Sequence, residues 1–300
     1  MRVTANMSAE TSLYNIQQGR AKLDRLQELT SSGVIVNTPS DDPINTRLLL
    51  DISDKLRAGD QYTSNIQKSI TWQQFTNAAL TGMSDIMALA KKQVGTINSG
   101  SSDATVRQNA VLQLQALKQQ LLDMGNMQLG DQYIFGGAIN STQPFSATAP
   151  YYAGDETALN VEISSNTTLQ MNVPGNQVLT ADTATSQPYG TTNILQAFDD
   201  LITAVNANDV AGIQAGSLAL AAGAKQIQNA QSDVVSRLTR LDNAGKMNGN
   251  IRNTLETVYS NTQNVDYAKL AVQLNQQKLA YESSLSATAK LSQMSLLDYL

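Results

Sequence analysis

The sequence predicts a mainly α-helical protein with one small inserted β domain, in which both chain ends together build a long antiparallel helical rod or coiled coil. Three features indicate this fold. The final stretch, Asp266 to Leu300, contains no Gly or Pro and carries an apolar stripe at helical spacing. A similar stripe lies near the N-terminus. Between Tyr133 and Gly190 the period changes to alternation, and four of the six prolines occur there.

The composition excludes several classes of site. The chain has no His and no Cys, which excludes thiol nucleophiles, His-based triads, zinc sites built on these residues and disulfides. No apolar run is long enough to span a bilayer, so we expect no membrane partner. The N-terminus also lacks the continuous apolar core of a secretory signal peptide. A protein of this kind that leaves the cell must use another route.

The charge distribution is uneven along the chain. The net charge is -5, and between Lys118 and Lys225 there is no Lys or Arg at all. The two flanks carry basic and acidic residues mixed along their length. Because a clustered basic stripe is absent, we expect no nucleic-acid partner. Nothing in the sequence indicates a cofactor.

The first helix is predicted from about Ala5 to Ser31, and Gly33 supplies its C-terminal stop. The next helix begins at Pro43, which suits a first helical position, and Asp42 before it is an N-cap candidate. Asp41 and Asp42 could instead be metal ligands or an acid/base pair. Capping explains them better, because no other candidate ligand can be placed beside them. Gly33, Asp41, Asp42 and Pro43 are therefore predicted to form a helix cap or hinge.

Further helices follow on both sides of the insertion. The helix from Pro43 is predicted to reach Asn98, and Asp103 caps its antiparallel neighbour. After the insertion Thr191 or Thr192 caps a short helix, and Asp209 caps a long one. From Ile227 on, the apolar stripe is predicted to flow into the terminal helix.

The insertion is predicted to be an exposed, acidic antiparallel β domain with its own small core. Its strands alternate around Val161 and Met171, and Pro174 to Asn176 is the predicted turn between two such runs. Asp155 and Glu156 give thin support for a glycosidase or protease carried on a helical stalk. Four aromatic residues are predicted to pack at the helix-to-sheet junction, although a carbohydrate platform is an alternative: Tyr133, Phe135, Tyr151 and Tyr152.

These patterns divide the chain into three parts. Residues 1–42 with 264–300 form a terminal helical assembly domain. Residues 43–132 with 191–263 form the helical rod, and residues 133–190 form the β-rich outer domain.

The terminal stripes have two possible partners. A lone amphipathic helix is marginal in water, so each stripe must pack either inside the chain or against other copies. From the residues alone, an intramolecular core and an assembly interface compete closely. The side chains concerned are Leu23, Leu26, Leu29, Leu270, Leu274, Tyr281, Leu285, Leu296 and Leu297.

Both chain ends resemble the bacterial flagellin family. The resemblance rests on the runs from Leu23 to Gly33 and from Thr38 to Pro43, and on the stretch from Ala268 to Leu300. The family usually has a basic residue after the glycine, whereas Val34 follows it here. Within the family, the opening Met1-Arg2-Val3, the run from Gly130 to Gly137 and the ending Ser295 to Leu300 resemble hook-associated members rather than the main filament subunit.

This resemblance implies a non-enzymatic structural subunit outside the cell, on the flagellum. It implies that the terminal helices polymerise in a ring or helical assembly, adapting the hook lattice to flagellin. The implied partners are further copies, flagellin above, another hook-associated junction protein below and a flagellar export chaperone. Export would need no cleavable signal peptide. The alternative within the family is flagellin, the filament subunit itself.

Overall fold

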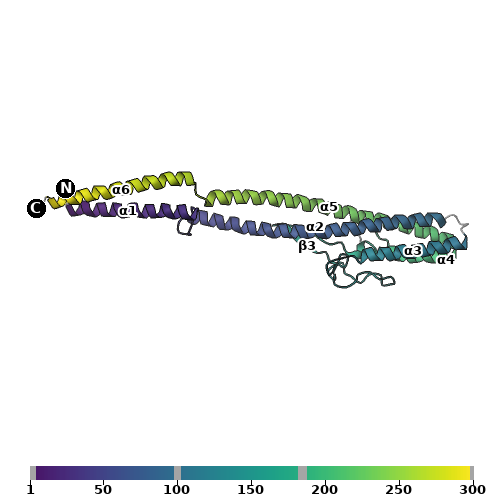
Figure 1. Ribbon diagram of the computed structural model, residues 1–300. Coiled ribbons are helices and arrows are strands. Elements are labelled where there is room, and N and C mark those ends of the chain that lie inside the picture. The colour runs from purple at the N-terminus through teal and green to yellow at the C-terminus, as the bar shows by residue number, and fades with distance from the viewer. Residues whose placement is uncertain (1–4, 98–102, 182–187, 298–300) are drawn as a thin grey trace. The chain divides into compact units, whose positions relative to one another are not determined.

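The computed structural model describes the backbone of residues 5–97, 103–181 and 188–297, and the side chains of residues 10–97, 103–181 and 188–290. Within these ranges the protein is mainly α-helical with two small β-hairpins (Figure 1). The predicted fold class is confirmed. The chain forms two compact units, one of residues 1–57 and 251–300 and the other of residues 58–250.

The first unit joins the two ends of the chain. Helix α1 (Ala5–Ser32) and helix α6 (Tyr267–Leu297) lie antiparallel and pack against each other (Figure 1). The unit also contains the start of α2 (Pro43–Ile97) and the end of α5 (Val210–Gln263). The backbone oxygen of Gly19 on α1 accepts a 3.0 Å hydrogen bond from the side-chain amide of Gln277 on α6.

The second unit is built around one continuous hydrophobic core. It combines the rest of α2 and α5 with α3 (Ala104–Gly125), α4 (Ile194–Ala207) and the inserted segment. Buried side chains of the insert belong to the same cluster as those of the four helices. The largest fully buried members include Leu80, Met83, Met87, Leu114, Leu121, Ile134, Phe135, Phe145, Leu179 and Phe198.

The strands are few and short. Strand β1 (Gln128–Leu129) pairs with β2 (Gln132–Tyr133), and β3 (Asn160–Ser164) pairs with β4 (Thr167–Gln170), both in antiparallel register. A short 3-10 helix, Gly175–Gln177, follows β4. The β3–β4 hairpin is anchored on the long helices by a second apolar cluster of Ile66, Ile163, Leu169 and Leu241.

A partly buried ion pair ties the insert to the helices. Lys118 Nζ on α3 lies 2.6 Å from Asp199 Oδ1 on α4 and donates a 2.7 Å hydrogen bond to the backbone oxygen of Ala147. The hydroxyl of Tyr151 donates a 2.7 Å hydrogen bond to Asp199 Oδ2. Burial, followed by the Asp199 carboxylate, raises the pKa of Tyr151 to about 12, so this hydroxyl keeps its proton.

Two expectations about the insert are wrong. It has no separate core, because Phe135, Phe145 and Leu179 pack into the core of the helices. The turn between β3 and β4 lies at residues 165–166, while Pro174 to Asn176 come after β4. Alternating apolar residues predict strands but not where the chain reverses.

Three details of the helix ends also differ from the prediction. Asp103 is at the N-cap position of α3, but its side chain accepts no capping hydrogen bond. Asn193 caps α4 in place of Thr191 or Thr192, since its side chain accepts a 3.0 Å hydrogen bond from the backbone N–H of Gln196. Helices α5 and α6 are not continuous, because Asn264 forms a β-bridge that ends α5.

The shared core predicts that truncating Phe145 destabilises the helices as well as the insert. Its ring is 1% exposed and lies 5.2 Å from the ring of Tyr152. We expect Phe145→Ala to lower the free energy of unfolding by about 3 to 5 kcal/mol, the usual cost of such a cavity. Urea denaturation followed by far-UV circular dichroism measures this loss.

Ile139→Ala is the matched control, because Ile139 lies in the same insert but is 47% exposed. The urea midpoint of this variant should lie close to that of the native chain. A helical transition that stays at its original midpoint in Phe145→Ala would contradict a shared core.

Candidate assembly surface on the terminal helices

The predicted stripe residues lie on the α1–α6 pair, and most of them are at least half-covered. Leu270 is buried, while Leu274 and Tyr281 on α6 are half-buried. On α1, Leu23, Leu26 and Leu29 are also half-buried. This burial occurs within a single chain. The stripes therefore supply an intramolecular contact between the two ends.

Other apolar side chains of the same helices remain uncovered. Leu285 is 50% exposed, although it was predicted with the stripe. Val272 and Leu279 on α6 are 57% and 64% exposed. They lie seven residues apart and on the side of α6 opposite Leu270 and Leu274, at about 3.6 residues per turn. Helix α6 therefore carries apolar side chains on two opposite faces. The side chains of Leu296 and Leu297 lie outside the described residues.

The chain leaves the helical conformation after α1 and between α5 and α6, and these two connecting segments pair with each other. α1 ends before Gly33, which has a φ of +72°, and a Cβ there would lie 2.5 Å from the hydroxyl oxygen of Tyr267. Val34 forms an antiparallel bridge with Asn264. The backbone N–H of Ile35 donates to the oxygen of Gln263 at 2.7 Å, and that of Val265 donates to Gly33 at 3.1 Å. These bonds hold the two connecting segments together.

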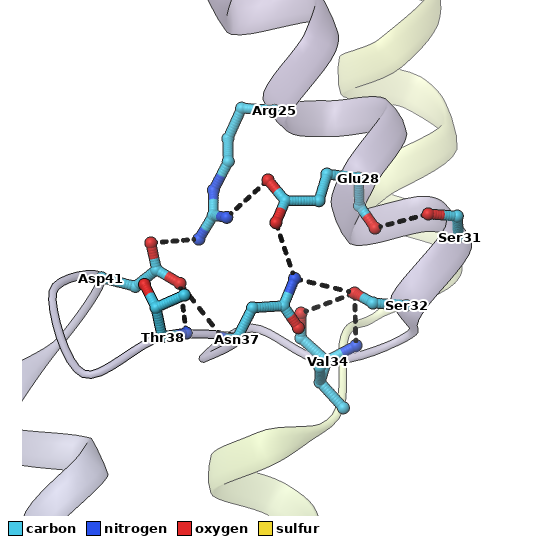
Figure 2. Close-up of polar contacts among 8 residues, drawn as sticks. All are labelled: Arg25, Glu28, Ser31, Ser32, Val34, Asn37, Thr38 and Asp41. Atoms are coloured by element: carbon cyan, nitrogen blue, oxygen red, sulfur yellow. Dashed lines mark hydrogen bonds and ion pairs between the residues drawn. The ribbon is translucent and has the colours of Figure 1, made fainter.

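A polar cluster fixes the segment after Gly33 against α1 (Figure 2). The guanidinium of Arg25 lies 2.8 Å from Glu28 Oε2 and 2.9 Å from Asp41 Oδ1. Asp41 Oδ2 accepts hydrogen bonds from the backbone N–H of Asn37 at 3.1 Å and of Thr38 at 2.9 Å. The side-chain amide of Asn37 donates to Glu28 Oε1 at 3.1 Å. Asp41 therefore links the turn at residues 37–38 to Arg25 on α1.

Asp42 and Pro43 start α2. Asp42 Oδ1 accepts hydrogen bonds from the backbone N–H of Ile44 at 3.1 Å and of Asn45 at 3.0 Å. Pro43 is the first residue of the helix. Neither aspartate is free to act as an acid/base pair, because both carboxylates are used by the turn and the cap. Ile44, directly after this cap, is 82% exposed.

Three members of the cluster, Arg25, Glu28 and Asn37, were not predicted from the sequence. Arg25 and Glu28 are three residues apart on a helix, which is a recognisable ion-pair spacing. Asp41 comes to Arg25 only through the turn after Gly33. No periodic pattern shows such a contact.

The cluster shifts the pKa values of its members. The ion-paired hydrogen bond from Arg25, then the one from Asn37, holds the pKa of Glu28 below its usual value. The backbone N–H of Thr38, then Arg25, does the same for the pKa of Asp41. The two carboxylates in turn raise the pKa of Arg25. All these groups are charged near neutral pH.

Comparisons with known proteins agree with these features. The family model described as the bacterial flagellin N-terminal helical region matches residues 3–139. Flagellar hook-associated protein 3 of Salmonella typhimurium is 25% identical over 212 residues, which cover 69% of this chain and 66% of that protein. The matched part thus spans slightly less than two thirds of this relative.

Solved structures show the same fold. A putative flagellar hook-associated protein from Vibrio parahaemolyticus has a TM-score of 0.66 at 20% identity, covering 75% of this chain and all of that one. The flagellar junction protein FlgL from Legionella pneumophila has a TM-score of 0.57 at 15% identity, covering 72% and 99%.

The pKa shifts predict that the cluster opens on acidification. Because both carboxyl pKa values are depressed in the folded state, the stabilisation they supply is fully present above the ordinary values of about 4. It is lost as the pH falls from there through the depressed values. Carbon NMR of the two carboxyl groups should give titration midpoints below the ordinary ones, with loss of amide protection at Asn37 and Thr38 over the same range.

Arg25→Gln is the matched variant, since it removes the cation and keeps a polar side chain. It should move both midpoints upward. Midpoints at or above the ordinary values in the native chain would show that the cluster does not form in solution.

Proposed function

We propose that this chain, which is a flagellin-like protein of the hook-associated protein 3 kind, is a structural subunit that joins the flagellar hook to the filament. As a component of the flagellum it acts outside the cell. Segments 1–42 and 264–300 make the assembly contacts, in a ring or helical assembly of copies. The observation that carries this proposal is the apolar surface of α6, which one partner helix covers on one side only.

The physical argument is one of unsatisfied burial. Soluble monomers rarely leave large contiguous apolar patches exposed, and such patches mark interaction sites. On α6, Val272 and Leu279 face away from the stripe that packs on α1. On α1, Leu13 and Tyr14 are exposed as well. A neighbouring copy that presents a helix to these faces would remove them from water.

A groove on the α1–α6 pair offers a second binding surface for a neighbouring helix. It has a volume of about 640 Å³ and runs between α1 and α6, with Ala21, Leu26 and Ala280 among its lining residues. Small side chains on both helices allow a third helix to approach closely. The remaining lining consists of Lys22 and Arg25 of α1 and of glutamine side chains of α6, so polar groups on the incoming helix would find partners.

The proposal includes finer partners. Flagellin binds above this subunit and another hook-associated junction protein below it, so that one lattice is adapted to the other. Before assembly the exposed faces of α6 need cover, which we assign to a flagellar export chaperone. Export proceeds through the flagellar type III apparatus. In the described ranges no helix is long and apolar enough to cross a membrane.

We propose no catalytic role. The carboxylates considered for a hydrolase have structural partners: Asp155 Oδ1 accepts from the backbone N–H of Ala138 at 2.6 Å, and Glu156 accepts from the amide of Asn176 at 2.6 Å. The Ala138 bond is the first cause of a lowered pKa at Asp155. Among the residues that the structure describes, no group of three or more acidic side chains could hold a metal ion.

Gene deletion separates the junction role from flagellin itself. A strain that lacks this chain should make hooks without filaments and shed unpolymerised flagellin, because the filament has nothing to grow on. Electron microscopy of the cells and immunoblotting of the medium measure both. Hooks with no shed subunit would show instead that this chain is the flagellin.

Complementation of that strain tests the α6 surface. The native chain should restore filaments, and so should Val272→Leu with Leu279→Met, which keeps the face apolar. Val272→Asp with Leu279→Asp should be secreted and helical by circular dichroism yet fail to restore them. Full restoration by the charged variant would remove this face from the interface.

A further inference from the structure

A polar cavity in the second unit takes no part in the proposed assembly. It lies between α3, strands β1 and β2 and the loop that follows them, and its volume is about 450 Å³. Sites for small molecules usually measure about 300 to 1,000 Å³. Two of its lining residues, Leu122 and Phe145, are apolar and buried. The cavity is therefore of a size and construction that suit a small ligand.

The wall of the cavity is held in place by internal hydrogen bonds. Asn126 forms two hydrogen bonds with the backbone of Phe145. Its Nδ2 donates to the Phe145 oxygen at 3.1 Å, and its Oδ1 accepts from the Phe145 N–H at 2.9 Å. Gln143 donates to the same oxygen at 2.9 Å. A Cβ at Gly125 would lie 2.8 Å from the Phe145 ring, so this ring has little room to move. A preformed wall lowers the ordering cost of binding.

Several polar groups of the lining remain available to a ligand. Gln119 donates to Asp123 Oδ1 at 3.1 Å, whereas Asp123 Oδ2 has no partner among the described residues. Within the same residues the side chains of Gln128 and Tyr133 make no hydrogen bond. The lining thus presents amide donors and acceptors, one free carboxylate oxygen and an aromatic ring.

The charge of the cavity limits the ligand class. Asp123 is the single Asp, Glu, Lys or Arg among its lining residues. No Lys or Arg occurs between Lys118 and Lys225, and Lys118 is already paired with Asp199. A phosphate or carboxylate would meet an unpaired negative charge and no cation. A neutral polyhydroxylated ligand meets both donors and acceptors.

We propose that this cavity binds a neutral saccharide. Ring hydroxyls donate to Asp123 and Gln128 and accept from the amides, while an apolar C–H face of the sugar packs on Tyr133. Only one carboxylate lines the cavity, and glycoside hydrolysis uses two. The site therefore binds and does not cleave.

This assignment refines the interpretation of the four aromatic residues singled out in the sequence. Tyr133 and no other of the four lines the cavity. Phe135 is fully buried, Tyr151 is bonded to Asp199, and the hydroxyl of Tyr152 donates to the backbone oxygen of Phe135 at 2.9 Å. Packing explains these three.

Saturation-transfer difference NMR on the full chain tests the proposal. Glucose and N-acetylglucosamine serve as neutral probes, and glucuronate serves as the anionic probe. We expect millimolar binding of at least one neutral sugar and binding of glucuronate weaker by at least about tenfold, because its carboxylate faces Asp123. Absence of signal from both neutral sugars, or equal binding of glucuronate, would overturn the assignment.

Two variants locate the site. Asp123→Ala and Tyr133→Leu should each weaken binding of the neutral sugar by about fivefold or more. Asp131→Ala is the matched control, since this exposed carboxylate in the β1–β2 turn does not line the cavity, and it should bind as the native chain does. If Tyr133→Leu does not fold, Asp123→Ala decides alone. Unchanged binding in Asp123→Ala would place the sugar elsewhere and contradict the proposal.

Discussion

The first unit depends on one constraint: α6 has apolar side chains on two opposite faces, and α1 can cover only one of them. The covered face holds Leu270, Leu274 and Tyr281, and the uncovered face holds Val272 and Leu279. Burial of apolar area is the main favourable term in both folding and association. A chain built in this way completes its fold inside the monomer, and in the proposed assembly a neighbouring copy covers the second face. That division connects the fold to the proposed junction role.

The segments that connect α1 to α2 and α5 to α6 are bonded to each other at the end of this helix pair. Gly33 lets the chain turn where a side chain would meet Tyr267. The bridge between Val34 and Asn264 holds the α1–α2 connection against the α5–α6 connection. The cluster of Arg25 and Asp41 then fixes the turn on α1. The side chains of this ion pair are still 35% and 21% exposed, and ion pairs open to solvent contribute little singly, so the role of the cluster lies in geometry more than in stability.

Helical periodicity was enough to predict α1, α2 and α6 and the change of pattern at the insert, because these depend on local spacing. Contacts between distant segments were not predictable in this way. The break at Asn264 exists because it pairs with Val34, and the Arg25–Asp41 contact exists because Gly33 turns the chain. The separate core expected for the insert was wrong for the same reason. Phe145 belongs to the insert by sequence, yet it packs against Gly125 at the end of α3.

Thiol accessibility at position 279 tests the central claim most directly. The native chain has no Cys, so Leu279→Cys introduces a single thiol on the uncovered face of α6. The account predicts rapid reaction with a maleimide in the free monomer and reaction at least about tenfold slower in isolated hook–filament junctions, since a neighbouring helix then excludes the reagent. A control thiol from Ile139→Cys, on the insert, should react rapidly in both. Equal rates at position 279 in monomer and junction would contradict the claim that this face is buried by assembly.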